Sequence, residues 1–194
     1  MKLPVLLSNH KAANFNLFLY RFADTQDYYV IEHGNIKNSK EPLVRIHSAC
    51  SFAHVFNSQR CDCQAQLDLA MLNIAKHRCG LLIYAWQQEG RAVGFWNHVR
   101  VYMEQDKGED TVSSYEVLGL PIDSRDYNDA VQILRDYKIY NLKLLTNNPK
   151  KIEALTDAGI KVKRAPLQTK VNKNNRSQIK VKINKLGHIL TMGK

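Results

Sequence analysis

The sequence predicts an α/β fold: a single domain with a mixed, mostly parallel sheet flanked by helices and an antiparallel N-terminal part. Apolar runs of strand length alternate with stretches whose apolar residues recur at helical spacing. The length of 194 residues suits one hydrophobic core. No internal repeat or low-complexity linker interrupts the chain. We therefore expect one domain over residues 1–194, with a basic C-terminal segment at residues 168–194.

The N-terminal part is expected to supply the antiparallel strands. Residues 15–32 hold two apolar runs around a polar turn from Asp24 to Asp27, which is typical of two adjacent strands. Residues 33–42 are polar and predict a loop. Residues 43–47 then predict a short strand that leads to the first cysteine.

The middle of the chain switches from helical spacing to strand spacing and back. A helix is predicted to end near His77, and the continuous apolar run from Gly80 to Trp86 predicts a buried strand. Cys79, at the start of that strand, is interpreted as a core thiol. Helical spacing returns after Gly90, with Val93, Trp96, Val99, Tyr102 and Met103 on the predicted apolar face.

The last third continues the alternation of helix and strand. Residues 126–137 predict a helix and residues 142–146 a strand. Asn148 is a predicted N-cap, followed by a proline at the first helical position, and Gly159 ends this helix. Residues 160–164 predict a further strand.

The positive charge is placed unevenly along the chain. The last 45 residues hold 12 Lys or Arg against 2 acidic residues, whereas residues 1–149 balance at 16 against 16. Three interpretations stay open: a nucleic-acid-binding tail, an electrostatic funnel for a small polyanion such as a nucleoside triphosphate, and a solvated basic surface. The tail lacks the regular aromatic interleaving of a base-stacking surface, which argues against nucleic acid.

The same composition suggests where the protein works. No run of about 18 apolar residues occurs, so no membrane span or membrane partner is expected. The apolar run after Met1 is too short for a signal peptide, and four cysteines without such a signal favour reduced thiols. We expect a cytoplasmic protein.

Three of the cysteines, Cys50, Cys61 and Cys63, follow a C-x10-C-x-C pattern. A zinc ribbon uses two CxxC pairs, whereas this spacing suits a metal held by three thiolates with a fourth position open to water. Zinc in such a site lowers the pKa of its water from about 16 to about 7. The alternative at this stage is three buried or incidental thiols.

Polar residues follow the buried strand and open the next helix. Loops after strands are where parallel sheets bind ligands. There, Arg91 can form a fork to a phosphate, and Glu89 can accept two hydrogen bonds from the N1–H and amino edge of a guanine-type base. A solvated loop would present the same residue types.

Two later loops have a similar character. Asp123 and Arg125 precede a predicted helix, where they can form either a surface ion pair or part of a site. The run from Thr146 to Lys151 ends a strand and offers hydroxyl, amide and lysine groups to a phosphate or a carbonyl. A plain capping loop is the alternative for that run.

Taken in order, these motifs resemble one family, GTP cyclohydrolase II of riboflavin biosynthesis. The resemblance runs from about residue 15 to residue 190 and rests on six runs in the family's order with a last echo in the tail. The runs are Val44-Arg45-Ile46-His47-Ser48, Arg60-Cys61-Asp62-Cys63, Gln88-Glu89-Gly90-Arg91, Gln105-Asp106 with Gly108 and Asp110-Thr111-Val112, Leu118-Gly119 with Asp123, Arg125 and Tyr127, and Leu144 to Lys151, followed by Asn174-Asn175 and Lys185 to His188.

The resemblance implies hydrolysis of GTP that depends on one zinc ion per chain and on Mg²⁺ with the triphosphate. Pyrophosphate and formate are released, and the product is 2,5-diamino-6-(5-phosphoribosylamino)pyrimidin-4(3H)-one. It also implies a homodimer. The zinc ligands would be Cys50, Cys61 and Cys63; the catalytic residues would be Arg125 as nucleophile, Asp123 as proton acceptor and Tyr102 near the purine; and GTP would be held by Arg45, Ile46, His47, Ser48, Ala49, Gln66, Glu89, Gly90, Arg91, Thr111, Thr146 and Lys151.

The sequence departs from the family's pattern near the zinc and the base. Ala49 stands where the family has a glutamate, and Phe52-Ala53-His54 replaces Thr-Gly-Asp. His54 can serve as a polar neighbour or as an extra ligand. Because these departures cluster on one side of the site, the alternative function is that of a divergent paralogue, which hydrolyses another nucleotide or gives a partly processed product. An arginine nucleophile is also unusual, since a guanidinium stays protonated at pH 7, so a phosphate clamp fits Arg125 better.

Overall fold

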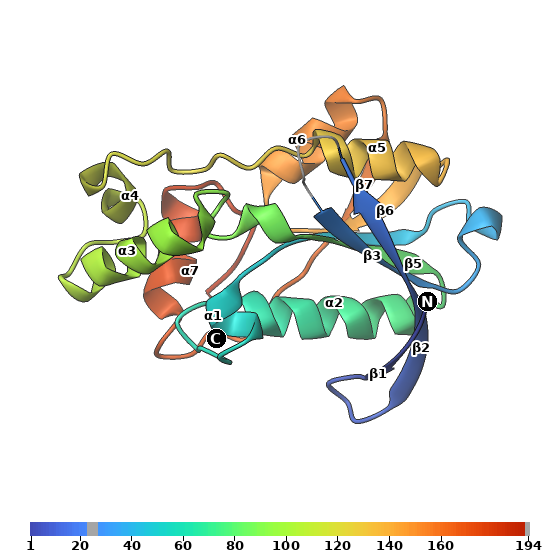
Figure 1. Ribbon diagram of the computed structural model, residues 1–194, viewed down its shortest axis with the longest axis horizontal. Coiled ribbons are helices and arrows are strands. Elements are labelled where there is room, and N and C mark those ends of the chain that lie inside the picture. The colour runs from blue at the N-terminus through green and yellow to red at the C-terminus, as the bar shows by residue number, and fades with distance from the viewer. Residues whose placement is uncertain (23–26, 193–194) are drawn as a thin grey trace.

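A seven-stranded mixed sheet forms the centre of the molecule, with helices on both of its faces (Figure 1). The coordinates are a computed structural model that describes residues 1–22 and 27–192. The strands are β1 (Lys2–Leu6), β2 (Ala12–Arg21), β3 (Asp27–His33), β4 (Leu43–Ser48), β5 (Gly80–Ala85), β6 (Asn141–Leu145) and β7 (Lys161–Ala165). The helices are α1 (Ser51–His54), α2 (Cys63–His77), α3 (Gly94–Asp106), α4 (Ser113–Val117), α5 (Asn128–Asp136), α6 (Pro149–Asp157) and α7 (Arg176–Asn184), with short 3-10 turns at Ile36–Asn38 and Trp86–Gln88.

The order of the strands divides the sheet into two parts. They run β1-β2-β3-β5-β4-β6-β7, and the four strands from β5 to β7 in this order are parallel to one another. The pairs β1–β2, β2–β3 and β3–β5 are antiparallel. The expected mixed sheet, with an antiparallel N-terminal part, is therefore confirmed.

Two apolar cores cover the two faces of the sheet, and β5 contributes to both because its side chains alternate. Leu81 and Ile83 pack with α5 and α6 in one core. Leu82 and Tyr84 pack with α2 in the other. All six residues of β5 are buried, which explains the continuous apolar run in the sequence.

Most of the predicted elements are present within a few residues of their expected bounds. Asn148 caps α6 by accepting a hydrogen bond from the backbone N–H of Lys150, and Pro149 is the first helical residue, as expected. The expected turn from Asp24 falls at residues 23–26, outside the described residues. No helix in the described part of the chain combines the length and the apolar character needed to cross a membrane.

One prediction about burial is wrong, and a second is met only in part. The expected apolar face of α3 includes Trp96 and Met103, which are 77% and 55% exposed, while the buried side chains include His98. The helix turns its polar residue inward because His98 has a buried carboxylate partner. Cys79 is half-buried and packs against the first core from its edge, with its Sγ 3.4 Å from the backbone oxygen of Asn35.

Candidate functional site

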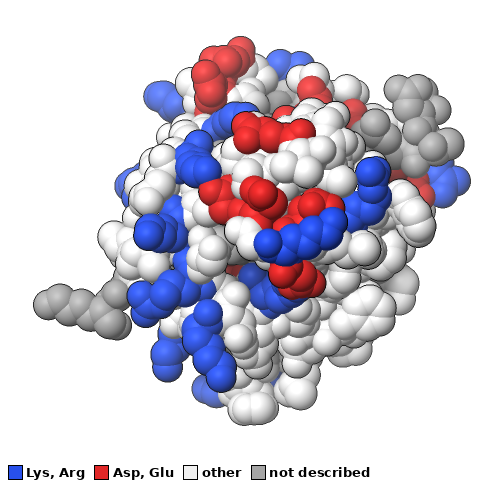
Figure 2. All heavy atoms as spheres, turned by 90° about the vertical axis from the view of Figure 1, so that its left-hand side faces the viewer, with Lys and Arg blue, Asp and Glu red and all other residues white. Residues whose placement is uncertain are grey.

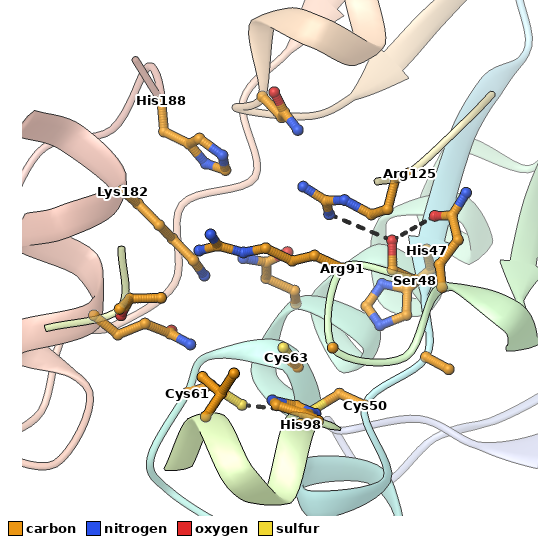
Figure 3. A pocket seen from close by; sticks show the side chains of 18 of the residues that line it. His47, Ser48, Cys50, Cys61, Cys63, Arg91, His98, Arg125, Lys182 and His188 are labelled. Atoms are coloured by element: carbon orange, nitrogen blue, oxygen red, sulfur yellow. Dashed lines mark hydrogen bonds between the residues drawn. The ribbon is translucent and has the colours of Figure 1, made fainter. Parts of the chain in front are cut away.

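The carboxyl ends of β4, β5 and β6 meet at one edge of the sheet, and the loops that follow them surround a cavity (Figure 3). Ligands bind at this edge in open parallel sheets. The cavity is lined by fifteen of the residues predicted for the site, namely Arg45, His47, Ser48, Ala49, Cys50, Cys61, Cys63, Gln66, Gly90, Arg91, Tyr102, Thr111, Arg125, Thr146 and Lys151. The structure thus brings together residues that lie more than a hundred positions apart.

The side chains of three predicted residues do not line this cavity. Ile46 is fully buried in the core, where its backbone oxygen accepts a hydrogen bond from Lys151 Nζ at 2.8 Å. Asp123 lies behind Arg125 and is bonded to it. Glu89 faces α1 and α3 instead.

The Glu89 carboxylate is fully engaged by protein groups. Its Oε2 accepts hydrogen bonds from the backbone N–H and the hydroxyl of Ser51, at 2.7 and 2.8 Å, and its Oε1 lies 2.6 Å from His98 Nδ1. Burial raises the pKa of Glu89, but the hydrogen bonds from His98 and Ser51 outweigh it and lower the pKa. In this structure the carboxylate is bonded to Ser51 and His98, and its contact with a base stays a prediction.

The loop after β5 is held in an uncommon backbone conformation. Gly90, Arg91 and Ala92 have φ angles of 55°, 60° and 68°, in the left-handed region that side chains other than glycine rarely adopt. The hydroxyl of Tyr115 donates to the backbone oxygen of Gly90 at 2.9 Å. A Cβ at Gly90 would lie 2.7 Å from the Cβ of His98, so only glycine fits there. This turn directs the Arg91 side chain into the cavity (Figure 3).

Three thiols converge at one end of the cavity. The sulfur atoms of Cys50, Cys61 and Cys63 all lie within 4.8 Å of one another, and those of Cys50 and Cys61 are 3.7 Å apart. Hydrogen bonds from the other two thiols lower the pKa of Cys61, which favours the thiolate form that binds metals. Three soft sulfur donors at this spacing form a possible metal site of the kind that suits zinc.

His54 is a neighbour of this site rather than one of its donors. Its Nε2 lies 3.2 Å from His47 Nε2, and its Nδ1 lies 2.7 Å from the hydroxyl of Tyr84. Among the described residues, the groups of possible metal donors around Cys50 do not include His54. The polar-neighbour interpretation of His54 therefore fits the structure, and the extra-ligand interpretation does not.

Several cations line the same cavity as the thiols. Arg45 and Lys151 are 5% and 3% exposed, and they donate hydrogen bonds to neutral acceptors, including the backbone oxygens of Leu145 and Ile46. Arg91 donates to a backbone oxygen at 3.3 Å. None of these three cations has a carboxylate partner within the described residues. Burial, and then the charges of Arg45 and Arg125, hold the pKa of Lys151 well below its usual range. The negative charge of a bound anion would raise the pKa of Lys151 and so offset the effects of burial and of the neighbouring cations.

Arg125 also lines the cavity, and hydrogen bonds hold its guanidinium in place. Its Nε and Nη2 each donate to Asp123 at 2.8 Å, and its Nη1 lies 3.5 Å from the hydroxyl of Ser48. Burial alone would lower the pKa of Arg125, but the bond to Asp123 outweighs it and raises the pKa. In the same pair, burial raises the pKa of Asp123, and the bonds and charge of Arg125 lower it to about 2. Both groups are charged at neutral pH.

Tyr102 lies between the thiols and an aromatic cluster. Its ring centroid is 4.7 Å from those of Phe52 and His98, and the Arg60 guanidinium lies 4.5 Å from the ring centre. Its buried hydroxyl has no hydrogen-bond partner among the described residues. Burial, followed by the charges of Cys61 and the other thiols, raises the pKa of Tyr102, so the hydroxyl keeps its proton.

Several cavity residues were absent from the sequence prediction. Gln88 and Asn147 lie inside motifs that the sequence analysis quoted, so their positions beside predicted residues were the available signal. His98 lies within a predicted helix, and no sequence motif marked it as a residue of the cavity. The C-terminal segment supplies three more, Gln178, Lys182 and His188, and only the tail echo pointed to one of them.

This fold and this cavity define a class of protein, an α/β protein with a possible three-cysteine metal site beside a pocket for an anionic ligand. The chain matches the GTP cyclohydrolase II family over residues 5–166, and it belongs to that family.

Curated relatives agree with this assignment. The chain is 43% identical over 170 residues to riboflavin biosynthesis protein RibBA of Bacillus cereus (strain B4264), covering 87% of this chain and 43% of the relative. It is 42% identical over 177 residues to RibBA of Aquifex aeolicus (strain VF5), covering 90% of this chain and 44% of the relative. The chain thus spans less than half the length of these relatives.

Proposed function

We propose that this protein hydrolyses GTP as a GTP cyclohydrolase II in riboflavin biosynthesis, releasing pyrophosphate and formate to give 2,5-diamino-6-(5-phosphoribosylamino)pyrimidin-4(3H)-one. The observation that carries the proposal is one cavity lined both by three converging thiols and by cations without carboxylate partners among the described residues. Such a cavity suits a ligand with a hydrolysable ring and a polyphosphate. Family membership supports the same reaction.

At the phosphate end, Arg45, Arg91 and Lys151 would bind the triphosphate, because they are pre-arranged and lack carboxylate partners. Arg125 would clamp the α-phosphate through its free edge, while Asp123 fixes the plane of the guanidinium. A clamp suits a guanidinium whose pKa is raised, whereas a nucleophile would first have to lose its proton. Mg²⁺ would enter with the substrate phosphates, as it commonly does.

At the thiol end, Cys50, Cys61 and Cys63 would hold one zinc ion, and their three sulfur atoms fit a site with an open fourth position. Bound zinc supplies a Lewis acid that lowers the pKa of water. The chain's own contribution is to bury this region and to place Tyr102 beside it. The Tyr102 hydroxyl would donate its hydrogen bond to a group of the bound purine, which would satisfy a buried donor that lacks a partner.

The experiment is to incubate zinc-loaded protein with GTP and Mg²⁺ and to measure formate and pyrophosphate separately by mass spectrometry. Equal amounts of the two products would support the full reaction. Pyrophosphate without formate would show that the zinc-side step is altered. If neither product forms, the proposed activity is wrong.

A divergent paralogue is the second candidate, and one observation favours it. The Glu89 carboxylate, which the resemblance places against the base, is bonded to Ser51 and His98 in this structure. We therefore propose the same product assay with ATP, ITP and XTP in parallel. A higher kcat/KM for one of these nucleotides than for GTP would identify this chain as a paralogue with another substrate.

We also propose a homodimer, which an exposed apolar patch supports. Leu19 and Tyr29 face each other across β2 and β3, and the Trp86 ring lies 5.4 Å from that of Tyr29. These three side chains are 56%, 37% and 45% exposed. Apolar patches of this kind often mark protein interfaces. Light scattering should give twice the chain mass for the native protein and the mass of a single chain for Leu19→Lys.

A cytoplasmic location also stays a prediction.

A further inference from the structure

Within the basic C-terminal segment, the described residues 168–192 form one wall of the cavity although they lie outside the range matched to the family. Lys182 and His188 point into the same space as Arg91 and Arg125 (Figure 3). The wall is therefore built from a part of the chain beyond that match, where only the short motifs Asn174-Asn175 and Lys185 to His188 resemble the family. Its side chains have no role in the function proposed above.

This segment is fastened to the site at three points. Lys182 Nζ donates to Asp62 Oδ1 at 2.5 Å, and the Asp62 side chain is 1% exposed. Lys185, at the C-terminal end of α7, pairs with Asp110. Beyond the helix, the backbone N–H of Ile189 donates to the backbone oxygen of Asn147 at 2.8 Å. His188 directly precedes this last anchor, so its position is fixed from both sides.

His188 faces cations from every element around it. Burial is the largest cause that lowers its pKa to about 3, followed by the charges of Lys182 on α7, Arg125 before α5, Lys151 on α6 and Arg91 after β5. The nearby carboxylates of Asp62 and Asp123 are already paired, with Lys182 and Arg125. His188 is thus neutral at pH 7 in a cavity with excess positive charge. A polyanion would reverse that balance and favour the imidazolium.

We propose that His188 is a ligand for the polyphosphate group of the substrate, and that it takes up a proton when that group binds. The inference rests on the proposed function, because it requires a polyphosphate in this cavity. The imidazolium would donate a charge-assisted hydrogen bond to a phosphate oxygen. The C-terminal segment would then be part of the binding site and not only a basic tail.

Isothermal titration calorimetry with magnesium pyrophosphate tests this proposal. Each titration is run at pH 7 in two buffers of different ionisation enthalpy, which gives the number of protons taken up. The proteins are the wild type, His188→Ala, His188→Gln and the control Lys180→Ala, which changes an exposed residue of α7 outside the cavity. Thermal unfolding shows whether each variant is folded, and GTP turnover of the wild type is measured in parallel.

We expect His188→Ala to bind pyrophosphate about 10-fold to 100-fold more weakly. Proton uptake should be smaller in both His188 variants than in the wild type, while Lys180→Ala matches the wild type. His188→Gln can still donate a hydrogen bond but cannot take up a proton, so reduced uptake there separates a charged ligand from a structural residue. A folded His188→Ala with wild-type affinity and proton uptake would overturn the inference while leaving the proposed function intact. A wild type without GTP turnover would overturn the proposed function itself.

Discussion

At the scale of single residues, the pair of Arg125 and Asp123 makes the sharpest distinction between two roles. A phosphate clamp needs the paired N–H donors of the guanidinium. A role that needs only a positive charge could also be filled by lysine. We expect Arg125→Ala to reduce pyrophosphate release by about 100-fold or more, and Arg125→Lys to recover only a small part of it. Steady-state assays of pyrophosphate release check both variants. Near-normal release from Arg125→Ala would end the proposed role of this residue.

The Asp123 carboxylate also links the site to stability. Its pKa is about 2 in the folded protein and about 3.9 in an unfolded chain, so the ionised form is favoured by folding. The stabilisation is therefore complete above about pH 4 and is lost as the pH falls through about 2. We expect Asp123→Asn to lower the free energy of unfolding by roughly 2 kcal/mol at pH 7. Urea titrations should show this difference shrinking below pH 4, and a constant difference down to pH 2 would contradict it.

A separate prediction concerns the three thiols of the possible metal site. Cys61→Ser should remove zinc and abolish formate release, because two thiols do not complete the site. Pyrophosphate release should stay measurable, since cations and not the thiols would hold the phosphates. Metal analysis and the two product assays check this, with Cys79→Ala as a control at the far end of β5. Loss of both products from a variant that still binds zinc would contradict this division of labour.

At the scale of elements, the sequence predicted the helices and strands that strong local patterns specify. It did not predict features that depend on contacts between distant residues. The apolar run of β5 and the Asn148-Pro149 signal of α6 are local, and both predictions were confirmed. α3 was assigned the wrong apolar face because the partner of His98 lies nine residues earlier, in a loop. The helix α7 was missed because its 9 residues are mostly polar, and it is held by a lysine paired with Asp62, 120 positions earlier.

The same reasoning explains which site residues could be predicted. Thr146 directly follows β6, Lys151 lies in the first turn of α6, and Arg45 lies within β4, so topology brings all three to the same cavity. Glu89 was also at a strand end, but its direction depends on Ser51 and His98, which no local pattern specifies. The sequence motifs located these residues at one edge of the sheet. The direction of each side chain could be determined only from the structure.

The N-cap of α6 gives a prediction for an element. Asn148 is 5% exposed, and its Oδ1 accepts a hydrogen bond from the backbone N–H of Lys150 at 3.0 Å. Asn148→Ala should lower the free energy of unfolding by about 1 kcal/mol, because a helix N–H loses its acceptor. Asn148→Asp should keep the cap. Chemical denaturation measures both variants, and equal losses in the two would show that another property of Asn148 is responsible.

At the scale of the whole molecule, the basic tail is partly used inside the protein. Lys182 and Lys185 pair with Asp62 and Asp110, and Lys182 also lines the cavity. On the end of the molecule that carries α3, α4 and α7, acidic side chains gather near the centre, with Lys and Arg beside and below them (Figure 2). This mixed surface differs from the continuous basic face that duplex DNA prefers. On this face, the structure therefore supports an electrostatic funnel over a DNA-binding tail.

The dependence of binding on salt distinguishes a funnel into a buried site from a DNA-binding tail. Arg45 and Lys151 are buried, and salt screens buried charges less than exposed ones. Affinity for a non-hydrolysable GTP analogue should fall less than about tenfold between 50 and 200 mM salt. A protein that neutralises six to ten DNA phosphates loses about 10³-fold to 10⁵-fold over the same range. Fluorescence anisotropy with the analogue and with random duplex DNA measures both. Tight DNA binding with that steep slope, together with weak binding of the analogue, would restore the nucleic-acid interpretation, because only exposed lysines would then be making the contacts.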